Sequence, residues 1–147
     1  MRTWKTQTTV AGLPDEVLAL LTEPEAIARW TPIPFELIDL DADRLLAGSR
    51  ARVLGRLAGR TLEFEVEVLA ADEERLALVA TGPISIDVEY RVRPLRRGSE
   101  LHASVSVRGS GLFGRLLAQA TDALLAAGAL NTAVNRIGRE LEPALAA

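Results

Sequence analysis

Two segments of the sequence alternate strictly between apolar and polar residues, and this pattern constrains the fold more than any other feature. The first segment, Thr61 to Val68, reads TLEFEVEV. The second, residues 84–93, sets isoleucine, valine and tyrosine against serine, aspartate, glutamate and arginine. A period of two residues is typical of antiparallel strands that have one face on a core and the other in water. The chain is therefore predicted to build a sheet with a single apolar face.

Further segments extend this sheet to about seven strands. Alternate apolar residues between Leu101 and Val107 predict another strand, and the threonine-rich segment Thr3 to Val10 predicts the first one. The dipeptide Gly59-Arg60 suits a two-residue type II′ hairpin turn. That register would place Arg56 opposite Glu63 and Arg52 opposite Glu67, on the wet face of the sheet.

Three helices complete the expected order of elements. The first begins at Leu13-Pro14, and a second short helix begins at Thr22 as its N-cap and runs to Trp30. The third runs from Leu112 to about Glu142 and is ended by Pro143. A helix of about 45 Å, at 1.5 Å per residue, is too long for a flat sheet of short strands to cover, so the sheet must curl around it. The predicted fold class is α+β.

The amino-acid composition argues against several classes of function. The 147 residues suit one domain over residues 1–147, and the chain contains no cysteine and a single histidine, His102, which is expected to face water. We therefore expect no metal site and no cofactor. The net charge of −3 argues against a nucleic-acid partner. Arg115, Asp122 and Arg136 make the most apolar stretch a poor membrane span, and a cytoplasmic location is expected.

The order of elements, together with Leu13 to Trp30 (LPDEVLALLTEPEAIARW), resembles the START-related SRPBCC superfamily and, within it, the polyketide cyclase/dehydrase and lipid-transport family. The glycine-rich start of the last helix, Gly109 to Gly114, is similar to that family as well. The resemblance implies a helix-grip fold with an internal pocket, and it covers nearly the whole chain. Its motifs are helix starts and packing signals, so they specify fold better than chemistry.

The candidate site combines inward-facing positions with those that the resemblance implies. Small residues on the last helix leave room beneath it, so either the sheet closes onto the helix or a ligand fills the space. The resemblance places the mouth of the pocket at the glycine-containing turns near residues 59, 82 and 109. The candidate ligand-binding residues are Trp30, Phe35, Phe64, Val66, Val88, Tyr90, Phe113, Leu117, Ala120 and Asn131.

Several of these residues have a purely structural alternative. Asn131 either binds a ligand or makes a backbone or water contact in the core. Tyr90 either offers its hydroxyl to a ligand or packs as a core aromatic, and Trp30 either flanks the pocket or plugs the end of its helix. Glu63, Glu65 and Glu67 resemble an acid–base cluster, but alternation places them on the wet face.

Three functions remain open. The first is binding or transport of an apolar, lipid-like or polyketide-like small molecule. The second is a polyketide cyclase or dehydratase, which would need an inward-facing acid–base pair that the apolar rows do not supply. The third is a chaperone co-activator or stress-response adaptor that uses its outer surface. A homodimer through the edge or outer face of the sheet is compatible with the sequence, although no motif supports it.

Overall fold

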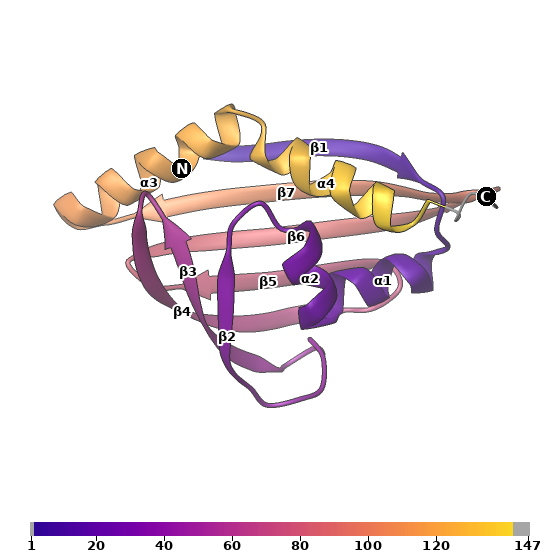
Figure 1. The fold of residues 1–147 in the computed structure, drawn as a ribbon, viewed down its shortest axis with the longest axis horizontal. Helices are drawn as coiled ribbons and strands as arrows, with labels where there is room; N and C mark the ends of the chain where they lie inside the picture. The colour runs from indigo at the N-terminus through magenta and orange to yellow at the C-terminus, as the bar shows by residue number, and fades with distance from the viewer. Residues whose placement is uncertain (1, 143–147) are drawn as a thin grey trace.

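A computed structural model describes residues 2–142 and shows one antiparallel sheet whose concave face holds the helices (Figure 1). In chain order the elements are β1 (Arg2–Val10), α1 (Pro14–Thr22), α2 (Pro24–Trp30), β2 (Phe35–Leu40), β3 (Arg50–Leu57), β4 (Arg60–Ala71), β5 (Arg75–Thr81), β6 (Ile84–Leu95), β7 (Gly98–Gly109), α3 (Gly111–Ala126) and α4 (Ala129–Glu140). The predicted α+β class, the strand number and the two short helices after the first strand are confirmed.

The sheet has the strand order β1-β7-β6-β5-β4-β3-β2, so the first strand pairs with the last and every other pair is local in sequence. In Figure 1, β2 and β3 run steeply across the direction of β6 and β7. This curl produces the concave face that the length of the last helical segment predicted.

Alternation along the strands sorts the side chains as predicted. On β4, Leu62, Phe64 and Val68 are buried, whereas the three glutamates between residues 63 and 67 are exposed. The core also takes in Leu21 from α1 and Ile137 from α4, both fully buried. Each side chain of this size stabilises the fold by about 1.5–3 kcal/mol when it leaves water.

The hairpin between β3 and β4 turns one residue earlier than predicted. Ala58 and Gly59 occupy the turn with φ angles of 53° and 74°, and Leu57 pairs with Arg60. Positive φ at both positions defines a type I′ turn, whose twist matches that of the flanking strands. The prediction of a turn at Gly59-Arg60 was wrong because Ala58, although not a glycine, adopts the left-handed conformation.

The earlier turn changes the partners of the charged residues but not their face. Arg52 lies opposite Glu65 instead of Glu67, and Arg56 is no longer opposite Glu63. Since each partner moves by two residues, every side chain keeps its predicted side of the sheet. The Nη2 atom of Arg52 lies 3.5 Å from Oε1 of Glu63, a diagonal ion pair on the exposed face.

The predicted single long helix is two helices. Gly128 separates α3 from α4 with a φ of 99°, a left-handed conformation that interrupts the helical hydrogen bonds. The helix α3 packs on β7, whereas α4 packs on β1 and α2 (Figure 1). Because the break resets the helical phase, Asn131 is exposed instead of central on the apolar face. The predicted stop at Pro143 lies outside the described residues.

The predicted N-cap at Thr22 is also wrong. Thr22 is the last residue of α1, and its hydroxyl donates to the carbonyl of Leu18 at 2.8 Å. The N-cap of α2 is Glu23, directly before Pro24. The start of α1 agrees with the prediction, since Pro14 is its first residue and the backbone N–H of Leu13 donates to the Glu16 carboxylate at 3.0 Å.

Candidate functional site

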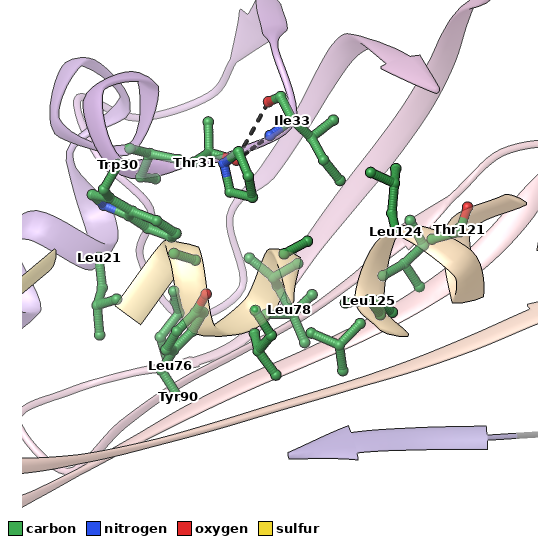
Figure 2. Close-up of a pocket in the computed structure, with 18 residues that line it drawn as sticks. Leu21, Trp30, Thr31, Ile33, Leu76, Leu78, Tyr90, Thr121, Leu124 and Leu125 are labelled. Carbon is green, nitrogen blue, oxygen red and sulfur yellow. Dashed lines mark hydrogen bonds between the residues drawn. The ribbon is translucent and has the colours of Figure 1, made fainter. Parts of the chain in front are cut away.

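An apolar pocket of about 210 Å³ lies between the concave face of the sheet, α2 with the loop that follows it, and the junction of α3 and α4. We call it the inner pocket. Figure 2 shows Trp30 and the loop on one side, Leu76, Leu78 and Tyr90 rising from the sheet on another, and Thr121, Leu124 and Leu125 at one end. The full lining comprises Leu21, Ile27, Trp30, Thr31, Pro32, Ile33, Leu76, Leu78, Ile86, Val88, Tyr90, Val105, Thr121, Leu124, Leu125, Ala129, Leu130 and Ala133.

The sheet side of the inner pocket follows directly from alternation. Leu76 and Leu78 on β5, and Ile86, Val88 and Tyr90 on β6, are alternate residues that face inward. Pairing of β5 with β6 sets Leu76 opposite Tyr90 and Leu78 opposite Val88. Side chains opposite each other on one face form a continuous apolar surface.

The loop after α2 forms the opposite wall because proline ends the helix. Pro32 and Pro34 cannot donate backbone hydrogen bonds, so the chain leaves the helix at Thr31. The Thr31 hydroxyl folds the loop by donating to the carbonyl of Ile33 at 3.3 Å. Arg136 of α4 donates from Nη1 to the carbonyl of Thr31 at 3.1 Å, which ties this wall to the last helix.

Small side chains at the helix junction create the space. Ala129 and Ala133 of α4 line the inner pocket where larger residues would fill it. Gly128, at the break, turns the chain so that the end of α3 and the start of α4 both contribute to the lining. Close packing is the rule in protein interiors, so an apolar space of this size is unusual for a domain without a ligand.

The lining residues, all within the described part of the chain, include only four with polar side-chain groups: Trp30, Thr31, Tyr90 and Thr121. The indole N–H of Trp30 donates to the carbonyl of Leu20 at 2.7 Å, and the Thr121 hydroxyl donates to the carbonyl of Leu117 at 2.9 Å. Thr31 uses its proton within the loop. Three of the four donors are therefore already used by the protein.

Tyr90 is the exception. Its ring meets the Trp30 ring edge to face, with centroids 5.6 Å apart and an interplanar angle of 74°. Its hydroxyl makes no hydrogen bond to another described residue, and its oxygen remains accessible to solvent. Burial raises the pKa of Tyr90 well above its ordinary value, because the low-polarity surroundings disfavour the phenolate. At neutral pH the residue therefore presents a neutral O–H donor to the inner pocket.

Three of the ten predicted site residues line the inner pocket, namely Trp30, Val88 and Tyr90. The other seven lie elsewhere in the structure. Phe64 and Leu117 are buried in the core beyond it, and Phe35, Val66 and Ala120 are half-buried outside it. Phe113 is 47% exposed under the guanidinium of Arg60, and the Asn131 amide oxygen accepts a hydrogen bond from Thr6 on β1.

The glycine turns do not form the mouth of the inner pocket. They do gather at the start of α3, where Arg60 stacks on Phe113 and the backbone of Gly114 lies against Pro83. None of their residues belongs to the lining. Beside these turns, Leu112 and Leu116 of α3 are 80% and 56% exposed, and together they form an apolar surface that the sequence pattern does not predict.

Ionisable groups gather on the outer face of the sheet, away from the inner pocket. Glu89 accepts from Arg91 at 2.6 Å and from Arg75 at 3.2 Å, and these hydrogen bonds and charges, Arg91 first, lower the pKa of Glu89. His102 contacts Glu100 and lies opposite Arg91, as predicted. These side chains form a solvated charge network rather than an acid–base site.

No three acidic or histidine side chains within residues 2–142, the described range, converge to hold a metal ion. No helix within it combines the length and apolar character needed to span a bilayer.

A sheet that curls around helices on its concave face, with an apolar pocket between the two layers, defines the helix-grip class of α+β proteins. The chain belongs to the polyketide cyclase / dehydrase and lipid transport family, whose model matches residues 1–142. No individually curated protein matches the sequence.

Solved structures confirm the fold. A protein from Chromobacterium violaceum has a TM-score of 0.74 at 17% identity, covering 97% of this chain and 99% of its own. The Zhui aromatase/cyclase from a Streptomyces species has a TM-score of 0.72 at 18% identity, covering 95% and 93%. A Thermus thermophilus protein has a TM-score of 0.70 at 14% identity, covering 95% and 97%. At these identities the likeness concerns the fold alone.

Proposed function

We propose that the protein binds an apolar small molecule in the inner pocket and acts as a carrier or binding protein. The observation that carries this proposal is the lining itself, in which aliphatic side chains dominate and most polar groups are already used by the protein. Ligand pockets typically have this character, with a few polar groups that fix orientation. The lipid transport in the family description agrees with it.

The volume sets the scale of the ligand and of its binding energy. An apolar cavity of about 150 Å³ holds benzene, so by proportion about 210 Å³ suits a ligand of roughly eight to ten non-hydrogen atoms. A lipid chain of greater length would require the loop after α2 or the helices to move. Leaving the space empty costs at most about 5 kcal/mol, at about 24 cal/mol per Å³. A ligand that fills it recovers part of this cost.

The cyclase alternative receives less support from the geometry. The Zhui aromatase/cyclase shares the fold, and the family description includes cyclases and dehydrases. General acid–base chemistry needs a proton acceptor as well as a donor near the reacting atoms. Within the described lining, Tyr90 is the one ionisable side chain, and its raised pKa makes it a donor and a poor base.

The test is native mass spectrometry of the protein purified from its own host, together with a variant that fills the inner pocket. Ala133→Leu adds bulk from a buried lining position, and Ala126→Leu makes the same change at an exposed position on α3. We expect a co-purifying apolar molecule with the native protein and the Ala126→Leu variant, and its loss with Ala133→Leu. Absence of any such molecule, and no binding of added apolar compounds, would contradict the proposal.

A further inference from the structure

The absence of charged side chains from the described lining restricts the ligands of the inner pocket further than its apolar character does. Among the described lining residues there is no lysine, arginine or histidine, and no aspartate or glutamate. We propose that the inner pocket selects uncharged ligands that carry a hydrogen-bond acceptor, such as a ketone or ester carbonyl, and rejects carboxylates. This inference rests on the proposed function and names the class of ligand.

The expected preference for ligands with a hydrogen-bond acceptor comes from the Tyr90 hydroxyl. Its ring is fixed on one side by the edge-to-face contact with Trp30 and on another by its place opposite Leu76 on the neighbouring strand. The hydroxyl therefore has a defined position in which its oxygen is accessible to solvent, and no protein atom among the described residues accepts its proton. A ligand acceptor at this point would complete the hydrogen bonding of the inner pocket. Such a bond is worth roughly two- to tenfold in affinity.

The rejection of anions follows from the absence of a positive partner. Arg136 is tied to the pocket wall, but its guanidinium donates to the Thr31 carbonyl and does not belong to the lining. Arg29, on α2, forms an ion pair with Glu140 at 3.3 Å. A carboxylate in the inner pocket would thus lose its hydration and gain one neutral donor. Burial of an unpaired charge is far more costly than burial of a paired or neutral polar group.

Three compounds of nearly equal size separate these effects, namely ethylbenzene, acetophenone and benzoate. They share a benzene ring and differ in having no acceptor, a neutral carbonyl, or a charged carboxylate. Their affinities would be measured at pH 7 by NMR titration, from the shifts of backbone amides of lining residues. We expect acetophenone to bind roughly two- to tenfold more tightly than ethylbenzene. Benzoate should bind at least about a hundredfold more weakly than acetophenone.

Two variants assign the effects to residues. In Tyr90→Phe, acetophenone should lose its advantage while ethylbenzene binds as before, which also shows that the variant is folded. In Arg136→Gln, benzoate should remain excluded, because that guanidinium is not part of the lining.

The outcomes distinguish this inference from the proposed function. If all three compounds bind alike, or if acetophenone keeps its advantage in Tyr90→Phe, the selectivity is overturned and the apolar site remains. If benzoate binds and Arg136→Gln abolishes this binding, the pocket recognises anions at its wall and the inference is overturned. If none of the three binds, both the proposed function and the inference fail.

Discussion

Gly109, the last residue of β7, is a position where the addition of a single methyl group should strongly destabilise the fold. A Cβ there would lie 2.6 Å from the carbonyl carbon of Gly114 in the first turn of α3, and closer still to its oxygen. The obstacle is backbone, so it cannot be relieved by a rotamer change. Gly109→Ala therefore forces α3 away from the sheet. Overpacking of this kind costs about 1–3 kcal/mol, and we expect the upper end.

Gly55 on β3 provides the matched control. It is also a strand glycine with no positive φ, and its nearest neighbour for a new Cβ is the Phe64 ring at 3.6 Å, an ordinary contact. Alanine reduces the freedom of the unfolded chain, so Gly55→Ala should raise the free energy of unfolding by about 0.4–1 kcal/mol. The two variants should therefore differ by about 3 kcal/mol.

The assay is urea unfolding followed by circular dichroism, with thermal melts in parallel. At about 2–4 °C per kcal/mol for a chain of this size, Gly109→Ala should melt at least about 6 °C below Gly55→Ala. Because α3 carries Thr121, Leu124 and Leu125 of the lining, Gly109→Ala should also weaken ligand binding. Equal stability of the two variants, within about 0.5 kcal/mol, would refute the close backbone packing of α3 on β7.

Three further predictions concern the helix junction, the free hydroxyl and acid stability. In Gly128→Ala the new Cβ meets no atom within 4 Å, but the alanine must adopt a φ of 99°, so urea unfolding should show a free energy of unfolding lower by about 1–2 kcal/mol. Gly128→Asn should lose less stability, because asparagine tolerates the left-handed conformation better. Unchanged stability of Gly128→Ala would contradict the left-handed break. Tyr90→Phe should change the stability of the ligand-free protein by less than about 0.5 kcal/mol, since the hydroxyl has no partner among the described residues, whereas a bonded hydroxyl would cost about 1 kcal/mol. The pKa of Glu89 in the folded protein lies below its ordinary 4.5, so the Glu89 carboxylate stabilises the fold above pH 4.5 and loses this effect as the pH falls through the folded-state pKa. Glu89→Gln should therefore destabilise the protein at pH 7 and less so at about pH 3.5. An equal loss of stability at both pH values would argue against the Arg91 and Arg75 contacts.

Most of the fold could be predicted because alternation and helix starts are local signals. The row of apolar residues on β4 and the proline at the start of α1 each depend on neighbouring residues only. Two local conformations escaped prediction for a shared reason, which is that single residues adopted positive φ. Ala58 did so against the usual preference, and Gly128 did so within a segment whose apolar periodicity continued on both sides.

The candidate site was predicted only in part, because alternation assigns the faces of strands but not those of the helices and the loop that complete the lining. Val88 and Tyr90 could be found because alternation assigns their face, and the same row contains Ile86, which the candidate set omitted. Leu76 and Leu78 were not found, because residues 75–81 (RLALVAT) are mostly apolar and give no alternation. Residues of the last two helices could not be placed, because the break at Gly128 changes which side chains face the sheet. The loop at residues 31–33 could not be predicted at all, since its position depends on a long-range bond from Arg136.

The pairing of β1 with β7 has a consequence for the order in which the protein is made. During synthesis, β1 leaves the ribosome about a hundred residues before its partner strand. Until then its edge and its inward side chains have nothing native to pair with, and closing so long a loop slows folding. The helices that complete the pocket emerge later still. A nascent chain therefore completes its sheet only after β7 has been made, and the ability to hold a ligand arises only once α3 and α4 have followed it.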